Sequence, residues 1–78
     1  MALVFHDKRV VFSGAVSVED AEPLLAWLLD KPAARVDFKA CTQVHPANLQ
    51  VLLAAGAQVA AWPADAALAG WLKSAFKP

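Results

Sequence analysis

The chain has 78 residues, of which 59% are hydrophobic, and its seven basic and seven acidic side chains leave no formal net charge at pH 7. This length fits one domain over residues 1–78, and the apolar content excludes intrinsic disorder. The balanced charge provides no single-sign field that would attract nucleic acid or an anionic membrane. Alanine supplies 18 of the apolar residues, so the core is small for a domain that must be stable alone.

The chain begins with two short segments that are rich in Val and Phe, residues 3–5 and 9–12. Both are predicted to be strands, and Asp7-Lys8 between them is expected to form a two-residue turn. Ser13-Gly14 is expected to end the second strand, because these residue types are frequent in turns.

A helix is predicted next, from about Asp20 to Leu29. Ser17 is followed three residues later by the carboxylate of Asp20, which resembles the capping box of a helix N-terminus. Pro23 is expected in the first turn, where its missing N–H costs nothing. The segment Asp30-Lys31-Pro32 is expected to stop the helix.

The second half alternates strands with helices. Residues 35–38 are predicted to form a strand, and a helix is predicted from Pro46 or Ala47 to Ala55, with Gly56 as its C-terminal cap. Residues 57–61 are predicted to form a buried strand. Asp65 is expected to cap a last helix, whose apolar residues have the spacing of one face: Leu68, Trp71, Leu72, Ala75 and Phe76.

The order β-β-α-β-α-β-α predicts an α/β domain with a small four-stranded sheet, mostly parallel or mixed, and helices packed on it. Residues 40–64 contain no charged side chain. We interpret them as a buried helix and strand rather than a membrane span, because polar residues are scattered through them and Pro46 and Pro63 lie near their ends. The single cysteine, Cys41, and the absence of a signal-peptide pattern in residues 1–12 favour the cytoplasm.

Several segments resemble the STAS domain, the fold of anti-sigma factor antagonists and of the cytoplasmic domains of sulfate transporters. The resemblance covers roughly residues 9–76 and is carried by Phe12-Ser13-Gly14-Ala15-Val16, Val36-Asp37-Phe38, Val44-His45-Pro46-Ala47-Asn48-Leu49, Val51-Leu52-Leu53 and the closing segment 65–72. It implies a STAS-like fold and a non-enzymatic, regulatory domain that binds another protein.

This chain departs from the STAS pattern at the start of the second helix. In phosphorylated members that helix opens with Asp-Ser-Ser/Thr-Gly, and the third residue accepts phosphate from a partner kinase. Here the segment is His45-Pro46-Ala47-Asn48, and Ala47 has no hydroxyl group. The helix and its following loop are also about ten residues short. The resemblance therefore implies the fold and a binding function, without the phosphoswitch.

The alternative hypothesis is a small enzyme or redox protein that uses Cys41 and His45. These residues are four positions apart in a predicted loop, and Asp37 could orient the imidazole or act as a third metal ligand. A cysteine in this context is more often a small core residue. We therefore expect no catalytic residue, no metal and no cofactor. The basic residues are dispersed, so nucleic acid is not an expected partner.

The residues expected to contact a partner protein are His45, Pro46, Ala47 and Asn48, together with Trp27 and Trp62. A homodimer through the helix at residues 20–29 is a further hypothesis. No single face of that helix can bury all five of its large apolar side chains, which are Leu24, Leu25, Trp27, Leu28 and Leu29. The leftover surface is expected to pack against a second copy, with Trp27 at or near the interface.

Overall fold

The computed structural model describes residues 2–31 and 33–76; Pro32, at the predicted stop of the first helix, lies outside them. The elements in chain order are β1 (Leu3–Phe5), β2 (Arg9–Val16), the 3₁₀ turn η1 (Val18–Asp20), α1 (Ala21–Leu29), β3 (Arg35–Val44), α2 (Pro46–Ala55), β4 (Gln58–Ala61) and α3 (Ala66–Ala75). The predicted order of strands and helices is thus confirmed.

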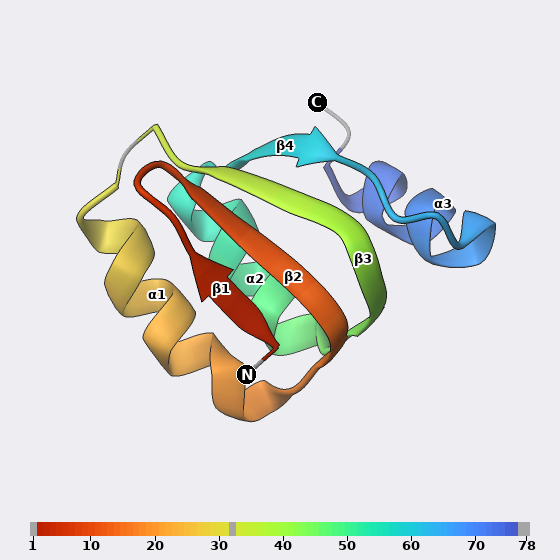
Figure 1. The fold of residues 1–78 in the computed structure, drawn as a ribbon, viewed down its shortest axis with the longest axis horizontal. Helices are drawn as coiled ribbons and strands as arrows, with labels where there is room; N and C mark the ends of the chain where they lie inside the picture. The colour runs from red at the N-terminus through yellow and green to blue at the C-terminus, as the bar shows by residue number, and fades with distance from the viewer. Residues whose placement is uncertain (1, 32, 77–78) are drawn as a thin grey trace.

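The four strands form one mixed sheet in the order β1-β2-β3-β4. β1 pairs antiparallel with β2, whereas β2 pairs parallel with β3 and β3 pairs parallel with β4. Parallel neighbours need long connections, and α1 and α2 provide them on one side of the sheet (Figure 1). The predicted α/β class and mixed sheet are confirmed.

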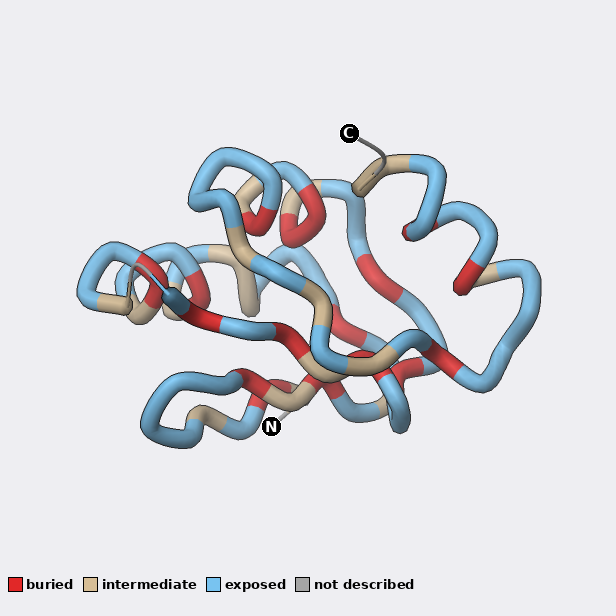
Figure 2. The backbone as a smooth tube through the Cα atoms, turned by 90° about the horizontal axis from the view of Figure 1, so that it is seen from above, coloured by how far each residue is buried: buried red, intermediate tan, exposed pale blue. Residues whose placement is uncertain are grey.

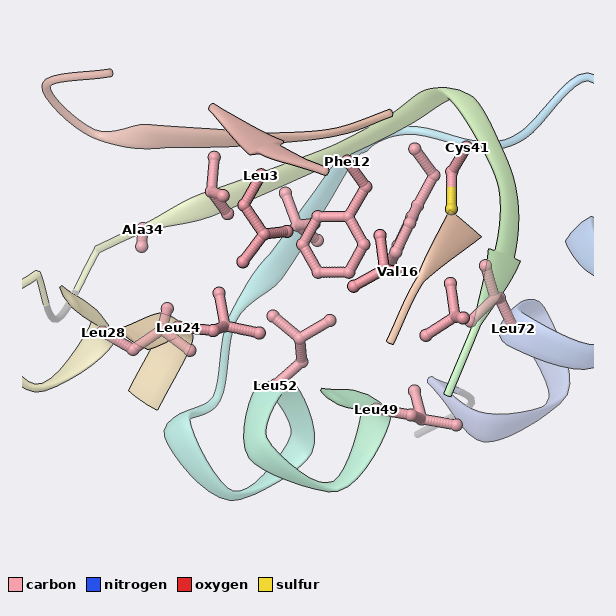
Figure 3. Close-up of a cluster of buried hydrophobic side chains, with 14 residues drawn as sticks. Leu3, Phe12, Val16, Leu24, Leu28, Ala34, Cys41, Leu49, Leu52 and Leu72 are labelled. Atoms are coloured by element: carbon pink, nitrogen blue, oxygen red, sulfur yellow. The ribbon is translucent and has the colours of Figure 1, made fainter. Parts of the chain in front are cut away.

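The core lies between the sheet and the helices. Phe12 of β2 and Phe38 of β3 are fully buried, and their ring centroids are 5.0 Å apart in an edge-to-face arrangement. The helices contribute the buried residues Leu24, Leu28, Leu49, Leu52 and Leu72, which point toward the strands (Figure 3). Buried and more exposed residues alternate at the start of β2, with Val10 and Phe12 in the core. Figure 2 shows how buried and exposed positions alternate along the backbone. The other face of the sheet therefore carries the remaining side chains of the strands.

Two strands continue further than the sequence predicts. Ser13-Gly14 does not end β2; Gly14 adopts a φ of 66° within the strand, and the register with β3 shifts between Gly14 and Ala15. Between these two positions β3 contains one residue more than β2, Thr42, which is the geometry of a β-bulge on β3. Gly14 lies opposite this bulge in a left-handed conformation that glycine adopts at little cost. β3 likewise runs on through Cys41 to Val44, so the loop predicted around Cys41 is wrong. Pairing up to Val16–Val44 sustains both extensions.

Short-range signals at the helix ends are confirmed. The carboxylate of Asp20 accepts the backbone N–H of Ser17 at 3.0 Å, and Pro23 lies in the first turn of α1. Gly56 ends α2 with a left-handed φ of 68°. Asp65 accepts the N–H of Leu68 at 2.9 Å and caps α3. Across residues 2–31 and 33–76, no helix has the length and apolar character needed to cross a membrane.

Candidate functional site

A pocket of about 270 Å³ lies where β2 and β3 end and α2 begins. We call it the strand-end pocket; it is lined by Ala15, Val16, Ser17, Gln43, Val44, His45 and Pro46. The carboxyl ends of parallel strands are where open α/β sheets usually bind ligands. The STAS resemblance also places its phosphoacceptor position, Ala47, at this helix start.

The first turn of α2 leaves few hydrogen-bond donors for a ligand. Pro46 has no N–H, and the N–H of Ala47 donates to Nδ1 of His45 at 3.0 Å. The N–H of Asn48 donates to the carbonyl oxygen of His45 at 2.9 Å. Helix N-termini bind phosphate through free backbone N–H groups. Because these groups are occupied or missing, the strand-end pocket is poorly suited to an oxyanion.

Asn48 holds the walls of the pocket together. Its side chain is fully buried, and its Nδ2 donates to the carbonyl oxygen of Ser17 at 2.6 Å. This bond ties the start of α2 to the chain segment that follows β2. Its Oδ1 has no hydrogen-bond partner among the described residues. Asn48 is a predicted contact residue, but its burial gives it a structural role and keeps it from a partner in this conformation.

The other three predicted contact residues of this segment lie closer to solvent. His45 and Pro46 are exposed and Ala47 is half-buried. The N–H of His45 donates to the carbonyl oxygen of Val16 at 2.9 Å, which fixes the segment against the end of β2. The exposed part of the predicted site is therefore small and held in place by backbone bonds.

Cys41 and His45 do not form an activated pair. Cys41 is buried in β3, and its Sγ donates to the carbonyl oxygen of Gln43 at 3.5 Å. Burial raises the pKa of the Cys41 thiol, whereas a nucleophilic cysteine needs a lowered pKa. Nδ1 of His45 is occupied by the N–H of Ala47. Asp37 accepts the N–H of Lys39 at 2.8 Å instead of orienting an imidazole.

Metal ligands are also not assembled in the described part of the chain. Within residues 2–31 and 33–76, no group of three or more His, Cys, Asp or Glu side chains is placed to hold a metal ion. The sequence spacing of Asp37, Cys41 and His45 therefore does not become a ligand set in this structure.

The two tryptophans of the predicted site lie near opposite edges of the sheet. Trp27 packs against Phe5 of the edge strand β1, with ring centroids 5.3 Å apart. Trp62 follows the other edge strand, β4; its ring lies 6.2 Å from that of Phe76, and Nζ of Lys73 lies 5.6 Å from it. The six predicted contact residues therefore do not form one surface.

Comparison of the chain with family models, with curated proteins and with solved structures finds no match. The STAS resemblance therefore rests on the quoted segments and on the order of the elements, and it enters the functional argument as a proposal.

Replacing Asn48 by Ala is expected to lower the free energy of unfolding by about 1–3 kcal/mol, because the carbonyl of Ser17 loses a buried donor. For a domain of this size, each 1 kcal/mol lowers the melting temperature by roughly 4–8 °C. Thermal unfolding followed by circular dichroism measures the change. Gln50→Ala, an exposed polar position of the same helix, is the control and should change stability by less than about 0.5 kcal/mol. Equal stability of Asn48→Ala and wild type would contradict the assigned role.

Proposed function

We propose that this chain is a non-enzymatic, STAS-like protein-interaction domain of the cytoplasm that has lost the phosphoswitch. The observation that carries the proposal is the apolar outer side of α1, where Leu25 and Leu29 are exposed. The lack of a hydroxyl at Ala47 and the occupied amides at the start of α2 support it further. Regulation of binding, where it exists, acts elsewhere than at Ala47.

The outer side of α1 exposes two leucines. Leu24 and Leu28 face the core, whereas Leu25 is 41% exposed and Leu29 is 75% exposed. Leu25 and Leu29 are four residues apart and lie one above the other on the same side of the helix. Burying a leucine contributes about 1.5–3 kcal/mol relative to leaving it exposed. An adjacent pair of exposed leucines is therefore a favourable contact for a protein partner.

The partner that we propose for α1 is a second copy of the chain. A small core gains proportionally most from additional burial, and two-fold dimers are the commonest assemblies of identical chains. The sequence predicts Trp27 at or near this interface, but in the structure its ring packs against Phe5 and is only partly exposed. We therefore assign the centre of the dimer contact to Leu25 and Leu29.

The dimer proposal is tested by size exclusion coupled to light scattering at about 100 μM. The expected mass is twice that of the 8.3 kDa chain, because pairing buries the outer side of α1. The double variant Leu25→Lys and Leu29→Lys is expected to run at the mass of one chain with an unchanged circular dichroism spectrum. Leu53→Lys, an exposed leucine on α2, is the control and should remain dimeric. A wild-type mass of one chain at every concentration would refute the dimer.

The alternative Cys41/His45 enzyme predicts a reactive thiol, and the proposal predicts the opposite. Because burial raises the pKa of Cys41, less thiolate is present at pH 8 than in the unfolded chain. We expect iodoacetamide to alkylate the native protein at least about tenfold more slowly than the denatured protein, since burial also limits access. Mass spectrometry at timed intervals measures both rates. Faster alkylation in the native state would favour the enzyme.

A further inference from the structure

The three parallel strands each begin with a side chain that donates hydrogen bonds. Arg9 of β2 is in register with Arg35 of β3, and Arg35 is in register with Gln58 of β4. All three are exposed, and each immediately precedes a residue whose side chain faces the helices, so the three share the uncovered face of the sheet. We call them the donor row. Because neighbouring strands lie about 4.8 Å apart, the two arginines extend side by side.

The strands carry more positive than negative charge, with Arg9, Arg35 and Lys39 against one acidic residue, Asp37. Asp37 lies two residues beyond Arg35 on the same face, and its Oδ1 accepts the backbone N–H of Lys39. Like charges at adjacent cross-strand positions destabilise a sheet. An anionic ligand that bridges both guanidinium groups would remove this repulsion and gain charge-assisted hydrogen bonds.

Apolar side chains lie next to the donor row. Val11 follows Arg9 by two residues on the same face, and Val4 of β1 is in register with Val11. Val4 is one of the most exposed large apolar residues of the described chain, at 47%. The uncovered face therefore combines two arginines with an apolar strip.

We propose that this face docks an acidic peptide segment of a partner protein, which also carries apolar side chains. Its carboxylates lie on Arg9 and Arg35, and its apolar side chains cover Val4 and Val11. The complementarity of charge and of apolar surface identifies the class of ligand. Asp37, which borders the row, favours a peptide over a nucleic acid, because a peptide backbone offers N–H donors to this carboxylate and a phosphodiester backbone offers none.

This second surface is independent of the α1 contact. α1 and α2 lie on one side of the sheet (Figure 1), and the alternation of burial along the strands places the donor row on the other side. A dimer through Leu25 and Leu29 leaves it free, and a monomer would present it equally. Peptide docking can thus succeed or fail whatever the oligomeric state proves to be.

The test uses the full chain labelled with ¹⁵N and a capped ten-residue peptide of alternating Glu and Val. We expect the peptide to shift the amide resonances of residues 9–11, 35–37 and 58–59, and the shifts to weaken with added salt. Arg9→Gln with Arg35→Gln should weaken binding at least tenfold. Lys73→Gln removes a positive charge on α3, outside the donor row, and should weaken it less than twofold.

Three results would overturn the proposal. The first is the absence of saturable shifts in the wild type, which needs no variant to fold. The second is a loss of affinity in Lys73→Gln that equals, per charge removed, the loss in the double arginine variant, which would mean that only net charge matters. The third is tighter binding of a ten-nucleotide oligothymidylate at the same residues, which would assign the face to nucleic acid.

Discussion

The parallel alignment of β2 with β3 determines where the other elements, the strand-end pocket and the donor row lie. It extends from Arg9–Arg35 at one end to Val16–Val44 at the other. Parallel strands cannot be joined by a tight turn, so α1 must cross over the sheet between them and contribute Leu24 and Leu28 to the core. The same alignment brings the strand-end pocket together at one end and the donor row together at the other.

The two ends of this strand pair differ in what they offer a ligand. At the carboxyl end, Pro46 lacks an N–H, and the N–H of Ala47 is already bonded within the chain. At the amino end, Arg9 and Arg35 are exposed and lie in register on neighbouring strands. The carboxyl end, where the STAS resemblance places the phosphoacceptor position, therefore offers fewer free groups to a ligand than the amino end does. The uncovered amino end is the better candidate for recognition.

The fold could be predicted from the sequence wherever short-range signals decide it. Capping by Asp65, the left-handed Gly56 and the Asp20–Ser17 bond are local features, and all are confirmed. The length of β2 could not be predicted, because local propensity assigns Gly14 to a turn. The non-local pairing with β3 instead keeps Gly14 within the strand, opposite the bulge at Thr42 of β3.

The candidate site was harder to predict than the fold. The exposure of His45 and the half-burial of Trp27 depend on tertiary packing, and so does the complete burial of Asn48. A polar residue in an otherwise apolar helix signals a buried hydrogen bond as well as a contact, and the sequence alone does not separate the two. The donor row could not be predicted from the sequence, because only the strand register brings Arg9 beside Arg35.

The most direct test of this account is the pattern of nuclear Overhauser effects between β2 and β3 in the ¹³C- and ¹⁵N-labelled protein. The account predicts contacts between pairs of residues whose numbers increase together along both strands, from Val10 with Val36 to Val16 with Val44. It also predicts contacts between the side-chain amide of Asn48 and Ser17. Contacts between pairs whose residue numbers increase along one strand and decrease along the other would show antiparallel pairing. That result would contradict the topology, and with it the positions of the strand-end pocket and the donor row.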